Sequence, residues 1–512
     1  MSDASAPVAT TSDGVLRGTL KGGVAAFLGV PYAEAPVGPL RFRAPEAVEP
    51  WDGVRDAVAF GATAPKRPYA PPLDALLPDP DVEGEDCLNL NVWAPWPRSA
   101  GERPVMVWIH GGSLVHGSSS VPVYDGAAFA RDGVVLVSLN YRLGIEGFGV
   151  FPDAPANLGL LDQLAGLAWV RRNIAAFGGD PERVTVFGES AGAISIAALL
   201  ASPLAKGLFR RAVLQSGAPT ALPLDRARRT TEAIAAHLGV EATARALSAV
   251  PRDQLLDAQT AVTGKGSPLT GGHSFQIAVD GEVLPREPGE ALREGASADV
   301  DLLMGTNSEE YRLWFVPSRL TERLSRLALR VALWRTKVPW RTTRAYRANR
   351  PGATPGELLG ALATDKLLRV PLYRLADARA EGRGATYVYE FGWRSPVLGL
   401  GACHALEIAF VFDTLDRPEA AALTGPDAPR ELAAAMHTAW VRFAESGDPG
   451  WRTWDASRPV MTFGRGAPRV VESPRDDERR AWDAGPARAR AGGESPGLTA
   501  RSVQGRATGG SR

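Results

Sequence analysis

The chain has 512 residues, 45% of them hydrophobic and 22% charged, which is the composition of a folded globular protein with a large buried core. Its 57 lysines and arginines balance its 57 aspartates and glutamates, so no overall charge favours a nucleic acid, an anionic membrane or a polyanionic substrate. No apolar run approaches the roughly 20 residues of a membrane span, and two cysteines, Cys87 and Cys403, are too few for a disulfide framework, so we expect a cytoplasmic protein with free thiols.

Apolar runs rich in β-branched residues predict the strands of one sheet. The three clearest are residues 105–109, 134–140 and 184–187, each followed by a glycine, asparagine or polar turn. Continuous apolar strands are typical of a parallel sheet that is covered on both faces. Further strands are predicted at residues 212–214 and 301–304 and, as the last one, 387–391.

Segments with leucine and alanine at helical spacing alternate with these strands. Residues 157–177 form a predicted helix between the second and third strands, which indicates a right-handed parallel crossover. Another helix is predicted at 193–200. Residues 311–380, rich in Leu, Arg, Trp and Ala, predict a helical insertion above the sheet that shapes a pocket. The sequence therefore predicts one α/β domain over residues 1–483, and a disordered tail at 484–512, which has almost no large apolar residue.

The pentapeptide Gly188-Glu189-Ser190-Ala191-Gly192 is a GxSxG motif between the strand at 184–187 and the helix at 193–200. This context is that of a nucleophile elbow, in which small residues allow a tight turn and the serine projects from the end of the strand. Ser190 is therefore the candidate nucleophile.

A glycine-rich loop, His110-Gly111-Gly112-Ser113, directly follows the strand at 105–109. Such a loop at the carboxyl end of a neighbouring strand can supply backbone amides to an oxyanion hole, and the residue after the nucleophile, here Ala191, supplies another. The alternative is that the two glycines only form a turn.

Histidines that could act as the base are few, because the order along the chain in this fold is serine, acid, histidine. Only His404 and His437 follow residue 310. We expect His437 to be packed or at the surface, since it lies in the amphipathic stretch 431–443, whereas His404 lies in a loop of small residues after a strand. Four histidines precede the acid and fit binding, packing or solvent better: His110, His116, His237 and His273.

Two adjacent glutamates, Glu309 and Glu310, follow the strand at 301–304 and are candidates for the acid. The residues alone do not choose between them, and both could instead be acids that begin a helix.

Several blocks of the chain resemble the type-B carboxylesterases, which include bacterial para-nitrobenzyl esterases, liver carboxylesterases and cholinesterases. The resemblance extends over roughly residues 12–483 and is carried, besides GESAG, by residues 27–33, 40–42, 85–92, 140–144, 157–163, 173–181, 215–217 and 401–412. It implies the α/β-hydrolase fold, with a central, mostly parallel, twisted sheet and helices on both faces.

The resemblance also implies roles for single residues. The block 305–310 is similar to a family block whose final glutamate is the triad acid, which is Glu310 here. Gly112, Ser113 and Ala191 are the implied oxyanion donors, with Ser113 at a position where relatives commonly have Gly or Ala. Ala64 lies where relatives usually have a cysteine, which agrees with a reducing compartment.

The implied activity is hydrolysis of a small-molecule carboxylic ester through an acyl-enzyme, with Ser190, His404 and Glu310 as the triad. We expect no metal and no cofactor, no membrane span, no nucleic-acid partner, and a monomer or small homo-oligomer. One alternative is the same triad acting on carbamates, lactones or activated amides. The other is a non-catalytic adhesion or scaffold protein related to cholinesterases, which the complete set of triad and oxyanion residues disfavours.

Overall fold

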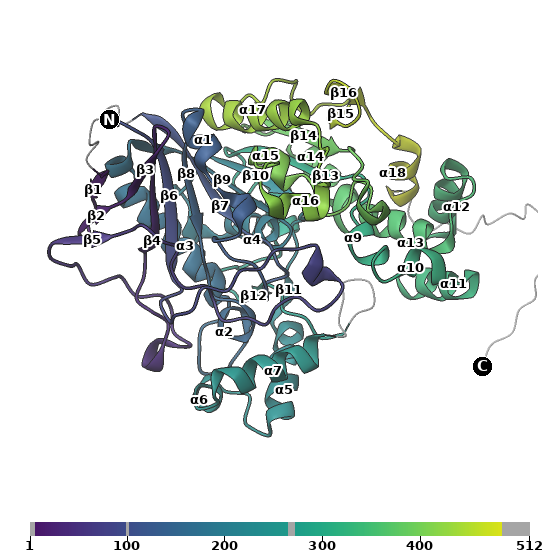
Figure 1. Ribbon diagram of the computed structural model, residues 1–512. Helices are drawn as coiled ribbons and strands as arrows, with labels where there is room; N and C mark the ends of the chain where they lie inside the picture. The colour runs from purple at the N-terminus through teal and green to yellow at the C-terminus, as the bar shows by residue number, and fades with distance from the viewer. Residues whose placement is uncertain (1–5, 99–101, 265–271, 484–512) are drawn as a thin grey trace, which may run out of the picture.

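A sheet of eleven strands runs through the computed structural model, which describes residues 6–98, 102–264 and 272–483 (Figure 1). Its strands are β3 (Thr19–Lys21), β4 (Val24–Pro31), β6 (Asn89–Pro95), β7 (Arg103–Ile109), β8 (Val135–Leu139), β9 (Gly179–Glu189), β10 (Arg211–Gln215), β13 (Asp301–Asn307), β14 (Thr386–Phe391), β15 (Pro459–Phe463) and β16 (Arg469–Glu472).

The strands lie in the order β16-β15-β14-β13-β10-β9-β7-β8-β6-β4-β3. All neighbours from β8 to β15 are parallel, whereas β6, β4 and β3 at one edge and β16 at the other pair antiparallel. Two small sheets lie outside it, formed by β1 (Val8–Thr10), β2 (Val15–Arg17) and β5 (Val54–Asp56), and by β11 (Leu222–Pro223) and β12 (Ala278–Val279). The predicted mostly parallel α/β architecture is confirmed.

Both faces of the sheet are buried, because side chains alternate between two cores along each strand. In β7, Val105 and Val107 belong to one core, and Met106 and Trp108 belong to the other. Helices that contribute to the first core are α2 (Gly144–Phe148), α3 (Leu158–Asn173), α4 (Ala191–Ala201), α5 (Leu224–Leu238), α6 (Ala244–Ser248), α7 (Arg252–Thr263), α8 (Pro288–Arg293) and α14 (Val370–Arg379). Helices that contribute to the second include α1 (Ala127–Arg131), α15 (Ile408–Val411), α16 (Pro418–Thr424) and α17 (Arg430–Ser446).

All six strands expected from the sequence are present in the sheet, and the predicted helices at 157–177 and 193–200 correspond to α3 with the short helix after it and to α4. The prediction that the strand at 387–391 is the last one was wrong. Two more strands follow it, β15 beside β14 and then β16. They were not predictable from an apolar run, because the middle of β15 is only partly buried and β16 has mostly exposed side chains.

Residues 312–379 form a series of helices beside the sheet: α9 (Arg312–Phe315), α10 (Leu320–Arg323), α11 (Arg326–Arg335), α12 (Trp340–Asn349), α13 (Pro355–Thr364) and α14. A separate small core joins α11, α12 and α13 through Leu329, Leu333, Tyr346, Leu358 and Leu362. The helix α18 (Asp476–Asp483) packs on α12. Figure 1 shows α10 to α13 gathered at one end of the molecule, away from the sheet.

Three expectations concern segments at the margins of this fold. The predicted tail at 484–512 lies outside the described residues. Cys87 and Cys403 are both buried free thiols. Among the described residues, no helix has the length and hydropathy that crossing a membrane requires.

Candidate active site

Ser190 lies at the sharp turn between β9 and α4, at the carboxyl end of a central strand. Its backbone has φ 54° and ψ −120°, a conformation that costs a non-glycine residue about 1–3 kcal/mol. Hydrogen bonds from Ser190 N to Gln215 O (2.9 Å) and from Ile194 N to Ser190 O (2.9 Å) hold it in place. The turn therefore presents the serine side chain at the end of the strand rather than within a regular element.

The two glycines of the pentapeptide are required by close packing of β9 and α4 against β7. A Cβ atom at Gly188 or at Gly192 would overlap the carbonyl oxygen of Ile109, the last residue of β7. Since that oxygen belongs to the backbone of a central strand, it cannot move aside cheaply.

The loop after β7 presents backbone amides next to Ser190. Gly112 has φ 110°, and its carbonyl oxygen accepts hydrogen bonds from Val115 N (3.0 Å) and His116 N (2.9 Å). Ser113 has φ 56°, so the chain stays in the left-handed region after the glycine. Among the described residues, the amides of Gly112, Ser113 and Ala191 have no acceptor. Three donors near one serine are thus available to a ligand.

His404 and Glu310 form a short, buried contact. His404 Nδ1 lies 2.6 Å from Glu310 Oε2, and Glu310 Oε1 accepts a hydrogen bond from Asn307 N at 2.7 Å. The exposed fraction is 1% for Glu310 and 6% for His404. A buried carboxylate at this distance fixes the orientation of the imidazole ring and makes Nδ1 the nitrogen that carries the proton.

Glu309 points elsewhere, although it is the neighbour of Glu310. Its Oε2 accepts a hydrogen bond from Ala402 N (3.1 Å), and its Oε1 pairs with Arg394 Nη1 at 3.0 Å. Its side chain is 18% exposed. Glu309 therefore holds the loop that precedes His404, whereas Glu310 contacts the ring itself.

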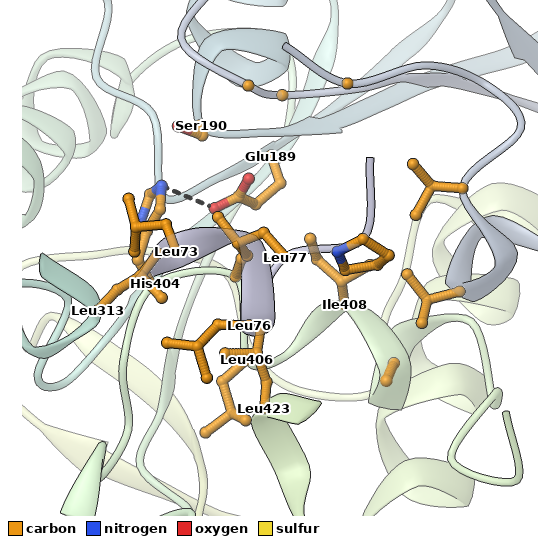
Figure 2. Close-up of a pocket in the computed structure, with 18 of the residues that line it drawn as sticks. Leu73, Leu76, Leu77, Glu189, Ser190, Leu313, His404, Leu406, Ile408 and Leu423 are labelled. Carbon is orange, nitrogen blue, oxygen red and sulfur yellow. Dashed lines mark ion pairs between the residues drawn. The ribbon is translucent and has the colours of Figure 1, made fainter. Parts of the chain in front are cut away.

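Glu189 is a second buried acid at the site, and its role was not predicted from the sequence. Its Oε1 lies 3.0 Å from His404 Nε2, an ion pair by distance that lacks the alignment of a hydrogen bond (Figure 2). Burial lowers the pKa of His404, but the charges of Glu189 and Glu310 outweigh it and raise the pKa well above its usual range. Burial in turn raises the pKa of Glu189. Its place inside the GxSxG motif was the only signal in the sequence.

Glu407 lies behind this group, with both oxygens bound to side-chain amides. Its Oε2 accepts from Asn307 Nδ2 (2.6 Å) and its Oε1 from Gln215 Nε2 (3.2 Å). Burial, followed by the charges of Glu189 and Glu310, raises the pKa of Glu407 to about 8. The raised pKa of Glu407 reflects its burial and the repulsion among three buried carboxyl groups.

A pocket of about 880 Å³, counting space open to solvent, contains Ser190, Glu189, His404, Gly112 and Ser113 in its wall. Figure 2 shows Leu73 and Leu313 beside the imidazole ring of His404, and further leucine side chains on the side of the pocket away from Ser190. Most of the remaining wall comes from residues 69–78, 121–124, 405–409 and 419–424. The segment 311–380 contributes Leu313 and Trp314, whose indole ring lies 4.9 Å from the ring of His404. The wall is mostly apolar.

Three other histidines pack within the fold and do not contact the triad. His437 is buried in α17, with Nδ1 donating to Val411 O at 2.8 Å, as expected for a packed residue. His110 stacks on Tyr141, and burial lowers its pKa to about 4. His116 stacks on Tyr69 and lies 3.3 Å from Asp79.

Comparison with known proteins identifies the family of this chain. The model of the Carboxylesterase family matches residues 5–462. The para-nitrobenzyl esterase of Bacillus subtilis (strain 168) is 40% identical over 86% of this chain and 90% of its own length. The phenmedipham hydrolase of Pseudarthrobacter oxydans is 37% identical over 89% of this chain and 94% of its own length.

Solved structures agree with these matches. The carboxylesterase EST55 of Geobacillus stearothermophilus superposes with a TM-score of 0.83 at 38% identity, covering 93% of this chain and 99% of that one. A para-nitrobenzyl esterase superposes with a TM-score of 0.80 at 34% identity. The α/β-hydrolase fold implied by the resemblance is thereby confirmed. The chain belongs to the carboxylesterase family and is an enzyme that hydrolyses carboxylic esters.

Proposed function

We propose that this chain cleaves small, uncharged carboxylic esters through an acyl-enzyme on Ser190, with His404 as general base and Glu310 as the acid that orients it. One observation supports this most strongly. The Glu310 carboxylate holds His404 Nδ1 at 2.6 Å, while Nε2 lies 3.0 Å from Glu189 Oε1 without a hydrogen bond among the described residues, and His404 lines the same pocket as Ser190.

In the first half-reaction His404 Nε2 takes the proton of the Ser190 hydroxyl while the serine oxygen attacks the ester carbonyl. His404 then gives that proton to the leaving alcohol. In the second half-reaction a water molecule loses a proton to His404 and attacks the acyl-serine, and the acid is released. Glu310 and Glu189 both stabilise the imidazolium that exists between these transfers, because their carboxyl groups lie within 3.0 Å of its two nitrogens.

The amides of Gly112, Ser113 and Ala191 form the proposed oxyanion hole. They have no protein acceptor among the described residues, so no hydrogen bond has to be broken before they bind the tetrahedral oxygen. One donor of this kind is worth about 100- to 1000-fold in rate.

The pocket supports an apolar, uncharged substrate. Its wall is dominated by leucine, valine and aromatic side chains, and Glu419 is its one charged side chain apart from Glu189 and His404 among the described residues. A charged group on the substrate would lose its hydration in this pocket without gaining a partner there.

The proposal is tested by hydrolysis of short-chain para-nitrophenyl esters by the wild-type enzyme and by Ser190→Ala. We expect turnover by the wild type and a loss of about 10⁶-fold in kcat in the variant. Absence of turnover by a folded wild-type protein would contradict the proposal and favour a non-catalytic relative.

A second substrate class belongs in the same assay. A carbamate, a lactone and an activated amide require the same nucleophile and base, and one of the relatives is named phenmedipham hydrolase rather than esterase. Comparing kcat/KM across these substrates and the esters ranks the classes. We expect simple esters to rank first, because they require no further group from the pocket.

A further inference from the structure

The segment 311–350 holds a strongly uneven share of the charge of the chain. It contains ten arginines and one lysine against a single acid, Glu322, in a protein whose cations and anions balance at 57 each over the whole chain. Positive charge is thus concentrated at the helical end that Figure 1 shows away from the sheet, and the rest of the chain has more acids than cations.

Several arginines of this segment pair with acids of the chain, among them Arg319 with Glu322. Arg350 pairs with the buried carboxylate of Glu478 on α18, and Arg312 lies 3.7 Å from Glu309. By contrast, seven exposed cations have no carboxylate partner among the described residues: Arg323, Arg326, Arg330, Arg335, Lys337, Arg344 and Arg347. Their charge is free to act on a partner outside the chain.

The helix α11 has two apolar faces, of which one is unpartnered. Leu329 and Leu333, 1% and 9% exposed, pack into the small core of the insertion. Leu327, Val331 and Trp334 are 70%, 44% and 79% exposed. Their spacing of four and three residues places them on one stripe of the helix, roughly opposite the buried leucines.

Arginines border that stripe on both sides. With about 100° per residue, Arg330 falls on one flank of the stripe and Arg335 on the other. A further exposed indole, Trp340 (72% exposed), begins α12 just after the turn that follows α11. Arginine flanking leucine and tryptophan on an exposed helical face is the composition of helices that lie in the surface of a lipid bilayer.

We propose that the outer face of α11, formed by Leu327, Arg330, Val331, Trp334 and Arg335, docks on the surface of a bilayer that contains anionic phospholipids. The apolar stripe would enter the boundary between headgroups and acyl chains, and Arg330 and Arg335, which flank the stripe, would lie at the level of the phosphates and carboxylates. This surface is outside the pocket wall, so the proposal does not depend on the identity of the ester.

Two other occupants fit the face less well. A second copy of the chain, packed through the same face about a two-fold axis, would bring the cations of the segment against themselves. A soluble protein that wraps an amphipathic helix in a groove needs access around it, but Leu329 and Leu333 fasten the inner side of α11 to α13. A flat anionic surface requires only the outer side.

The test measures partition of the full-length protein onto vesicles by sedimentation. Vesicles of phosphatidylcholine alone are compared with vesicles containing roughly one-third phosphatidylserine, at low and at high salt. The variant R330E/R335E is matched by R226E/R229E, which reverses two exposed arginines on α5. The variant L327A/W334A is matched by L204A/V54A, which shortens two apolar side chains that are each 54% exposed.

We expect the wild type to bind the phosphatidylserine vesicles, less at high salt, and to bind phosphatidylcholine alone much more weakly. Each cation at an anionic surface is worth about fivefold in binding, so R330E/R335E should bind at least about 25-fold more weakly. L327A/W334A should bind roughly 100-fold more weakly, at roughly tenfold per apolar side chain. The two matched variants should bind like the wild type, and all four should keep wild-type hydrolysis of a water-soluble ester.

Four results would overturn the proposal. Wild-type protein that does not partition onto anionic vesicles at low salt, or α11 variants that bind as well as their controls, would exclude bilayer docking by this face. A change of oligomeric state in the α11 variants, measured by light scattering, would assign the face to a second copy of the chain. Binding to heparin that both α11 variants lose, without vesicle binding by the wild type, would assign it to a soluble polyanionic partner.

Discussion

Replacing Glu310 by glutamine tests the orientation of the base, and the adjacent Glu309 supplies the matched control. The two glutamates are neighbours in the sequence, but their burial and their contacts differ. Glu310 is buried and lies 2.6 Å from His404 Nδ1, whereas Glu309 is partly exposed and holds Ala402 N and Arg394.

The expected loss for Glu310→Gln is large. An amide in place of the carboxylate removes the charge that stabilises the imidazolium and can offer an N–H to Nδ1, which favours the wrong tautomer. The corresponding change in a serine triad lowers kcat by about 10⁴-fold, or about 5.5 kcal/mol at 1.36 kcal/mol per factor of ten.

For Glu309→Gln the expected loss is small. Glutamine keeps an oxygen for the hydrogen bond from Ala402 N, and the lost ion pairs are one with Arg394, which is about half exposed, and a longer one of 3.7 Å with Arg312. Such pairs contribute about 0–1 kcal/mol, which corresponds to less than about fivefold in rate if the whole effect reached the transition state.

The assay is the steady-state hydrolysis of a water-soluble ester by both variants, with thermal unfolding measured to confirm that each is folded. Glu310→Gln should lower kcat with little change in KM, since the interaction acts on the transition state. Losses of equal size in the two variants, or a larger loss for Glu309→Gln, would refute the assignment of Glu310 as the orienting acid.

Three further predictions follow from the surroundings of the site. Glu189→Gln removes a negative charge beside His404 and so lowers the pKa of that base. Because the base must be neutral to accept a proton, the acid limb of the pH profile of kcat/KM should move to lower pH. An acid limb that stays in place or moves to higher pH would disprove the coupling between Glu189 and His404. Gly192→Ala places a methyl group against the Ile109 carbonyl, so we expect little soluble protein or a marked fall in melting temperature, and a variant with wild-type stability and kcat would contradict the close packing at the elbow. Trp108→Ala empties a fully buried position at the centre of the sheet and should cost about 3–5 kcal/mol in the free energy of unfolding, measured by denaturant titration, whereas a cost below about 1 kcal/mol would show that the core refills the space.

The centre of the fold was predictable because its strands are apolar on both faces. Residues 105–109 and 184–187 read as strands in the sequence since every side chain in them is buried. The edges were harder. β2 spans three residues, and β16 exposes most of its side chains, so neither has a hydrophobic period long enough to stand out.

The site shows the same division between local and tertiary information. The turn at Ser190 was predictable, because the strand, the glycines and the helix are contiguous in the sequence. The contact between Glu189 and His404 joins residues 215 positions apart in numbering, and only the meeting of β9 with the loop after β14 creates it. Adjacent acids such as Glu309 and Glu310 cannot be separated by pattern, because the direction of each side chain depends on how the loop closes.

Segments outside the helical insertion line more of the pocket than the sequence indicates. From the sequence, residues 311–380 were expected to shape the pocket. Of this segment, Leu313 and Trp314 line the pocket in the described part of the chain. The loop at 69–78 and the segment 419–424 form more of it. These segments have no strong hydrophobic periodicity, so their sequence does not indicate that they line the same pocket as Ser190.

Covalent labelling of Ser190 tests the central claim most directly. A fluorophosphonate reacts with an activated serine and leaves a stable adduct, which peptide mass spectrometry assigns to one residue. The account predicts a single adduct on the peptide that contains Ser190, loss of ester hydrolysis in proportion to labelling, and no adduct in Ser190→Ala. Folded wild-type protein that hydrolyses esters but is labelled at another residue, or not at all, would contradict it.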